Sequence, residues 1–105
     1  MILNKDILKS LESEIGYADL TELIKVFIED LQQNYSKLQV DLISNEELSS
    51  ITHTLKSTAG TFGAEELSLL AFEINTGIKA KKFNDSSRIK LKETISETID
   101  VFSKY

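Results

Sequence analysis

The sequence of 105 residues contains no cysteine and no proline, and it has only four glycines and one histidine. The lack of cysteine excludes disulfide bonds and thiolate metal sites, and it is compatible with a reducing compartment. The lack of proline permits long uninterrupted helices, because no residue removes a backbone donor from their interior. The glycines, at positions 16, 60, 63 and 77, are therefore the main candidate chain breaks.

Long apolar runs are also absent. No stretch approaches the ~18 apolar residues of a membrane-spanning helix. The first residues lack the basic start and the long apolar segment of a signal peptide. We therefore expect a soluble, cytoplasmic protein, and the length suits a single domain that covers residues 1–105.

Positive charge is scarce, since 17 acidic residues stand against 12 basic ones and the net charge is −5. Nucleic-acid binding needs a basic footprint, so we exclude it as a function. An acidic chain is also poorly suited to an anionic membrane surface. Lys79, Lys81 and Lys82 form a local basic cluster. We interpret it first as a helix end favoured by the helix dipole and second as a partner-facing patch.

Apolar residues recur at helical spacing through most of the chain, and no strand pattern competes. The longest periodic run has apolar residues at Leu20, Ile24, Phe27, Leu31, Tyr35, Leu38 and Leu42. The predicted helices span residues 4–15, 18–43, 44–62, 64–81 and 86–103. Four long helices with short connections predict an all-α fold, an antiparallel up-down four-helix bundle with a short additional N-terminal helix. The stripes are too irregular for a coiled-coil seam, which favours a monomer.

Polar residues that cap helix termini support these boundaries. Ser44 and Glu47 have the spacing of a capping box. Gly16 and Gly63 are expected to end the first and third helices. The other predicted caps are Asn4 for the first helix, the pair Asp19 and Glu22 for the second, and Asn84 or Asp85 for the last.

The third predicted helix carries the only histidine, His53, on its outer face. At about 100° per residue, His53 lies about 170° from the centre of the apolar stripe. The stripe consists of Leu48, Ile51, Leu55, Ala59 and Phe62, and the neighbours of His53 on the wheel are Ser49, Lys56, Ser57 and Gly60. A glycine inside a helix costs roughly 1 kcal/mol relative to alanine. We assign Gly60 no packing role on this outer face and predict that it clears space around the imidazole.

Several kinds of catalytic and metal-binding site are excluded because the sequence lacks the residues or motifs that they need. The acidic pairs at Glu46 and Glu65, each followed by another glutamate, are interpreted as helix-start charges, so we predict no metal site. A di-iron bundle would need Glu-x-x-His on its helices, and a hydrolytic triad would need a buried acid behind the histidine. The chain also has no glycine-rich phosphate loop, and so we expect neither ATP binding nor kinase activity of its own.

The remaining chemistry is nucleophilic. A neutral imidazole attacks a phosphoryl group near neutral pH, and Lys56, one turn after His53, would place an ammonium beside that group. The small residues Ser57 and Gly60 would let a partner approach. The alternative interpretation is that His53 is an incidental surface histidine and Lys56 a solvated helix charge.

These residues resemble a known family. The stretch from His53 to Leu67, together with residues 23–31, is similar to the histidine-containing phosphotransfer (HPt) domains, whose motif is His-x-Leu-Lys-Gly/Ser followed by small residues and Gly-Ala-x-x-Leu. The resemblance implies a four-helix bundle in which His53 accepts and donates a phosphoryl group with help from Lys56. It also matches Gly60, Gly63 and Ser57 to the small positions of the motif. Asn75 matches a glutamine that orients the imidazole in many members, with a shorter side chain.

The resemblance further implies partners and cofactors. Response-regulator receiver domains and an upstream hybrid sensor kinase would be the partners, and Mg²⁺ would belong to the receiver, so the chain itself would need no cofactor. Within the family, the stand-alone length and the stretch from Phe62 through Lys81 are similar to quorum-sensing phosphorelay proteins of the LuxU type. Met1 directly before the first helix favours a separate protein, and a domain cut from a larger hybrid kinase is the alternative left open.

An exposed apolar residue is needed where a receiver docks. Phe72 is the first candidate because it lies nearest Asn75 on its helix. The other off-stripe candidates are Val26, Ile28 and Leu69, and each of the four could instead be a residue at the edge of the bundle. The alternative function is a non-catalytic adaptor or receiver-sequestering bundle, which would share this fold and leave His53 idle.

Overall fold

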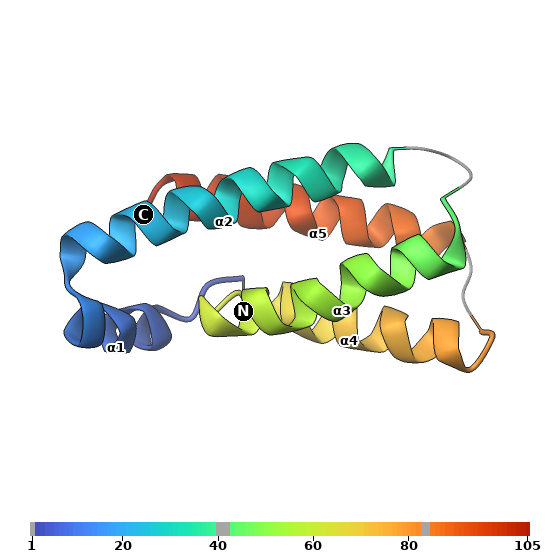
Figure 1. Cartoon of the computed structure of the whole chain (residues 1–105), viewed down its shortest axis with the longest axis horizontal. Helices are drawn as coiled ribbons and strands as arrows, with labels where there is room; N and C mark the ends of the chain where they lie inside the picture. Colours follow the sequence, from blue (N-terminus) through green and yellow to red (C-terminus); the bar gives the residue numbers. More distant parts are fainter. Residues whose placement is uncertain (1, 40–42, 83–84) are drawn as a thin grey trace.

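The computed structural model describes residues 2–39, 43–82 and 85–105, and these residues form helices and turns without any strand. The helices are α1 (Lys5–Ile15), α2 (Tyr17–Leu38), α3 (Asn45–Thr61), α4 (Glu65–Lys79) and α5 (Asp85–Ser103). Figure 1 shows α2 beside α5 and α3 beside α4, with neighbouring helices antiparallel and α1 at one end, next to the start of α2. The predicted all-α four-helix bundle with a short additional N-terminal helix is confirmed.

The core forms where the apolar stripes of the four long helices meet. The buried positions of α2 are those of the predicted period, namely Leu20, Ile24, Phe27, Leu31 and Leu38, together with Asn34. The ring of Phe27 stacks on Phe62 with centroids 4.7 Å apart and meets Phe102 edge-on at 5.3 Å. These aromatic contacts join α2 to the end of α3 and to α5. Among the described helices, none has the length and apolar character needed to cross a bilayer.

The first two helices meet at Gly16. Asn4 caps α1, because its side-chain oxygen accepts the backbone N–H of Asp6 at 3.0 Å, as predicted. Gly16 ends α1 with φ 89° and ψ 161°, a backbone conformation that only glycine adopts readily. Since α2 starts directly afterwards at Tyr17, Asp19 lies inside its first turn. The predicted capping pair of Asp19 and Glu22 is therefore wrong.

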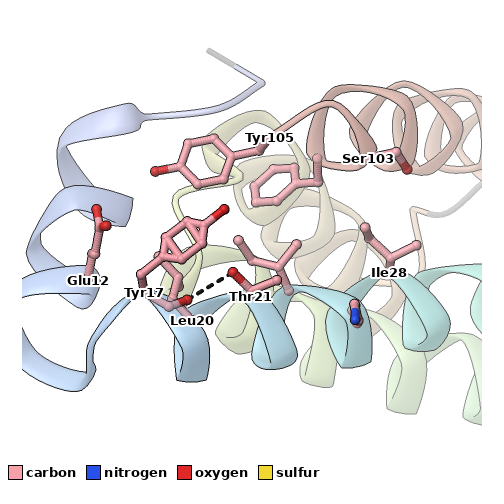
Figure 2. Close-up of a pocket in the computed structure, with 10 residues that line it drawn as sticks. Glu12, Tyr17, Leu20, Thr21, Ile28, Ser103 and Tyr105 are labelled. Atoms are coloured by element: carbon pink, nitrogen blue, oxygen red, sulfur yellow. Dashed lines mark hydrogen bonds between the residues drawn. The ribbon is translucent and has the colours of Figure 1, made fainter.

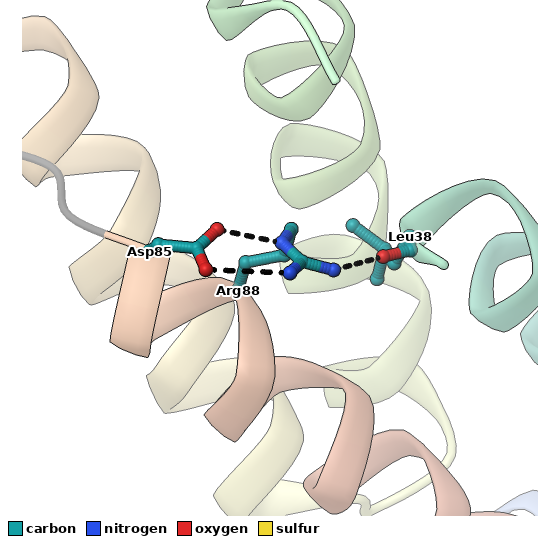
Figure 3. Close-up of polar contacts among 3 residues, drawn as sticks. All are labelled: Leu38, Asp85 and Arg88. Atoms are coloured by element: carbon teal, nitrogen blue, oxygen red, sulfur yellow. Dashed lines mark hydrogen bonds and ion pairs between the residues drawn. The ribbon is translucent and has the colours of Figure 1, made fainter. Parts of the chain in front are cut away.

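The second helix ends earlier than predicted. It stops at Leu38 and not at residue 43, and Ile43 is outside any helix. The carbonyl oxygen of Leu38 at this helix end accepts a hydrogen bond at 2.7 Å from Nη1 of the buried Arg88, fifty positions away in the sequence. Figure 3 shows this contact and the two hydrogen bonds of the same guanidinium to Asp85. The predicted position Leu42 lies outside the described residues.

The remaining helix ends follow from side-chain and backbone hydrogen bonds. The hydroxyl oxygen of Ser44 accepts the N–H of Glu47 at 3.1 Å, which confirms the predicted cap of α3. Helix α4 ends at Lys79 and not at Lys81, which has a positive φ of 59° and lies in the turn after the helix. The candidate cap Asn84 lies outside the described residues, and Asp85 is the first residue of α5.

Candidate functional site

His53 lies in the middle of α3 and is exposed to solvent, whereas Thr52 and Leu55 beside it are fully buried. The buried stripe of α3 fixes this rotation of the helix, because the stripe has to face the core. The predicted outward orientation of the imidazole is confirmed. The neighbouring Ser57 is small and exposed, as expected.

Lys56 and Phe72 extend the site from α3 to α4. The ammonium nitrogen of Lys56 lies over the Phe72 ring, 5.7 Å from its centroid. The Phe72 side chain is 51% exposed although it is large and apolar. His53 and Lys56 are neighbours on the surface of α3 because they are one helical turn apart. We name His53, Lys56 and Phe72 the transfer row, since they place an imidazole, a cation and an exposed ring in sequence across two helices.

Gly60 has a packing role, although the sequence analysis predicted none for it. A Cβ atom at Gly60 would lie 3.3 Å from the hydroxyl oxygen of Ser68 on α4. That hydroxyl donates a hydrogen bond to the carbonyl oxygen of Lys56 at 2.7 Å. The missing side chain therefore lets α4 approach α3 closely beside the transfer row, while Gly60 itself stays exposed.

Gly63 does not open the site, which corrects the predicted access role. It is buried, its φ is 80°, and its carbonyl oxygen accepts the N–H of Asn4 at 2.7 Å. A Cβ atom there would lie 2.8 Å from the Asn4 carbonyl oxygen and 3.2 Å from Cβ of Ile7. Gly63 therefore anchors the N-terminal segment against the turn between α3 and α4.

Asn75 does not hold the imidazole directly. Its side chain is only 7% exposed, and its amide nitrogen donates to the carbonyl oxygen of Ser49 and to the hydroxyl of Thr52, each at 3.0 Å. The same nitrogen lies 3.3 Å from the Ser49 hydroxyl oxygen. In an α-helix, the Ser49 carbonyl is also the acceptor for the N–H of His53. Asn75 thus fixes the backbone beneath His53, so the assisting role that the resemblance implies for this shorter amide is indirect, through the backbone of α3.

Thr52 and Ser68 are not among the predicted site residues, although both contribute to the seam between α3 and α4. Thr52 is fully buried, and its hydroxyl also donates to the carbonyl oxygen of Leu48 at 2.9 Å. The sequence gives one indication of this role: Thr52 is a polar residue on the apolar side of its helix, and a buried hydroxyl needs a hydrogen-bond partner. That signal does not identify the partner.

Of the four candidate docking residues, Phe72 is the one whose side chain lies beneath the Lys56 ammonium, and Leu69 lies one helical turn before it on α4. Leu69 is 60% exposed but lines a groove with Glu66 and Glu73 of its own helix and with residues of α5. Val26 is exposed on α2, and Ile28 packs against the core. Phe72 is therefore the candidate that the structure brings next to Lys56.

A separate hollow of about 320 Å³ opens between the start of α2 and the end of α5 (Figure 2). Tyr17, Leu20, Phe102 and Tyr105 contribute to its largely apolar wall. The described residues that line it belong to α1, α2 and the C-terminal part of the chain, so the hollow is distinct from the transfer row. Within the described ranges, no group of three or more histidine, aspartate and glutamate side chains is placed to hold a metal ion.

Comparisons with known proteins find similarity over most of the chain. The Hpt domain matches residues 22–99, a range that contains the whole transfer row. The phosphorelay protein LuxU of Vibrio cholerae is 32% identical over 87 residues, which cover 81% of this chain and 77% of that protein. LuxU of Vibrio vulnificus is 36% identical over 81 residues, 74% of this chain and 70% of that protein. LuxU of Vibrio harveyi is 30% identical over 87 residues, 80% and 75% of the two chains. No solved structure is significantly similar.

Proposed function

The chain belongs to the Hpt domain family, and on that premise we propose that it carries a phosphoryl group on His53 between aspartates of other proteins. It is a histidine phosphotransfer protein of a phosphorelay, like the LuxU proteins that it resembles. The observation that supports His53 as the carrier is that it is the only histidine in the sequence. Its exposure on α3 supports the same assignment, because a partner has to reach the imidazole.

The proposed reaction is an in-line displacement at phosphorus. The unprotonated ring nitrogen of His53 attacks the phosphoryl group of a phosphoaspartate, and a P–N bond forms while the P–O bond to the aspartate breaks. The electron pair of the broken bond leaves with the carboxylate, and the N–H of the imidazole stays on its other nitrogen. Transfer to a second aspartate is the reverse of this step.

Within this proposal, Lys56 supplies the charge compensation on the side of the carrier. Its ammonium lies one turn after His53, where it neutralises negative charge on the oxygens of the transferred group. The Mg²⁺ bound by the partner supplies the corresponding charge on the other side. The proposal therefore assigns this chain a nucleophile and one cation, and it needs no cofactor of its own.

We propose response-regulator receiver domains as the partners and a hybrid sensor kinase as the upstream source. Receiver domains supply the phosphoaspartate that the chemistry requires, and a kinase has to introduce the group from ATP. A relay fed by ATP suggests the cytoplasm as its location. The irregular stripes and the acidic surface support a monomer.

Labelling separates this function from the alternative of a non-catalytic adaptor. Incubation with a receiver domain that carries a radiolabelled phosphoryl group should transfer the label to the wild-type chain. The bond should be acid-labile and base-stable, as expected for a phosphoramidate. The His53→Gln variant should bind the receiver, keep its helical circular dichroism and take no label.

Two outcomes would contradict the proposal. Label on His53→Gln would assign the carrier role to another residue. Binding of the receiver by wild-type protein without transfer would favour the adaptor, provided that the same receiver passes its label to a known Hpt domain.

A further inference from the structure

We infer that Phe72 is a positioning residue for phosphoryl transfer, because its ring holds the Lys56 ammonium at the His53 face before the phosphoryl group arrives. This inference rests on the proposed function. Lys56 is half-buried, and its ammonium nitrogen lies 5.7 Å from the centre of the Phe72 ring. A cation over an aromatic face is attracted by the ring's electron density. The contact therefore restrains a flexible charged group whose location matters for the reaction.

Restraint matters because an exposed lysine samples many rotamers. A lysine held over a ring on the reacting face has lost part of this freedom before the partner docks. Less ordering is then needed in the transition state, where the ammonium has to neutralise phosphoryl oxygens. Phe72 would thereby accelerate a reaction in which it touches no reacting atom.

The packing of α4 against α3 fixes the ring at this position. Ser68, Phe72 and Asn75 follow one another at spacings of four and three residues, so they lie on one face of α4. Ser68 donates to the Lys56 carbonyl oxygen at 2.7 Å, and Asn75 donates to the Ser49 carbonyl oxygen at 3.0 Å. Phe72 therefore lies between two hydrogen bonds that set the register of the helices.

The same geometry predicts a change after transfer. A hydrogen bond from an ammonium to a phosphoryl oxygen is stronger than a cation–π contact at an exposed site. Phosphorylation of His53 should therefore draw Lys56 away from the ring and uncover Phe72. The phosphorylated and unphosphorylated surfaces would then differ in exposed aromatic area beside the imidazole.

The main test separates the π-electrons of Phe72 from its apolar bulk. Phe72→Leu keeps an apolar side chain and removes the ring, whereas Phe72→Trp keeps a ring that binds cations at least as well. We expect Phe72→Leu to lower the maximal transfer rate about two- to fivefold with little change in KM for a phosphorylated receiver. Phe72→Trp should restore the rate, and Phe72→Leu should have no further effect in a Lys56→Met background.

Tyr17→Leu is the matched control, since it removes a ring that is 67% exposed and lies outside the transfer row. A second readout does not depend on transfer. The ε-methylene protons of Lys56 should show an upfield ring-current shift in the wild type, and Phe72→Leu or phosphorylation of His53 should remove it.

Three outcomes would overturn the inference. The first is a wild-type rate for Phe72→Leu, and the second is an equal loss in the presence and absence of Lys56. The third is a rise in KM alone without rescue by Phe72→Trp, which would make Phe72 a docking residue. Failure of the proposed function is distinct from all three, because the wild-type chain would then take no label.

Discussion

Asn75 shows how one side chain controls a neighbour that it does not touch. Its amide nitrogen donates to the Ser49 carbonyl oxygen, which is also the helical acceptor for the N–H of His53. A longer amide could reach the imidazole, whereas this shorter one stops at the backbone. The position of His53 therefore depends on a hydrogen bond between α3 and α4 that lies one turn before it.

We expect Asn75→Ala to loosen the backbone at His53. The substitution removes the donor to Ser49 and Thr52, and it should lower the free energy of unfolding by about 1–2 kcal/mol. Amide hydrogen exchange of His53 should become faster relative to the rest of α3. The matched control is Ser68→Ala, which removes a different side-chain hydrogen bond between these helices, from Ser68 to the Lys56 carbonyl. Equal exchange of the His53 amide in the wild type and Asn75→Ala would contradict the assigned role.

The turn between α3 and α4 shows how a helix end is stabilised by a distant segment. Ala64 N–H donates to the Ala59 carbonyl oxygen at 2.8 Å and Gly63 N–H to the Gly60 carbonyl oxygen at 3.2 Å, a pattern that needs a left-handed residue at Gly63. Asn4 then closes over this turn, and its side-chain amide also donates to the Glu65 carboxylate at the start of α4. The N-terminal segment is thus part of the framework that supports α3.

Gly63→Ala should destabilise the protein by about 2 kcal/mol or more, because alanine at a positive φ is strained and its Cβ would meet the Asn4 carbonyl. Gly77→Ala is the matched control, since a Cβ there would meet nothing within 4 Å and the residue is helical. That control should stabilise the protein by about 0.5–1 kcal/mol. Urea unfolding of both variants measures the difference, and equal midpoints would contradict the strained conformation assigned to Gly63.

In the bundle as a whole, features set by nearby residues could be predicted from the sequence, and features set by distant residues could not. The helical periods, the Ser44 cap and the outward face of His53 could be predicted, because each depends on residues within a few turns. The partner of the Leu38 carbonyl at the end of α2 and the function of Gly63 could not, since they involve Arg88 and Asn4 in distant parts of the chain. The hydrogen-bond partners of Asn75 could not be predicted either, because they lie on another helix.

Arg88 connects two helix ends, and this contact should govern the stability of the bundle. Its guanidinium donates to the Leu38 carbonyl oxygen at the end of α2 and to the Asp85 carboxylate in the first turn of α5. Arg88→Met keeps much of the apolar stem and leaves the Leu38 carbonyl without this donor. We expect the free energy of unfolding to fall by about 2 kcal/mol, measured by urea unfolding at pH 7.

Acid should weaken the same connection. The hydrogen bond from Arg88 lowers the pKa of the Asp85 carboxyl below its ordinary value of 3.8. A carboxyl with a depressed pKa in the folded state adds stability that is present above its unfolded pKa and is lost as pH falls through its folded pKa. The wild type should therefore lose this contribution below about pH 4, whereas Asp85→Asn should lack it at every pH. If the difference in stability between the two proteins is the same at pH 7 and pH 2, the ion pair does not contribute, and the carbonyl of Leu38 alone explains the effect of Arg88→Met.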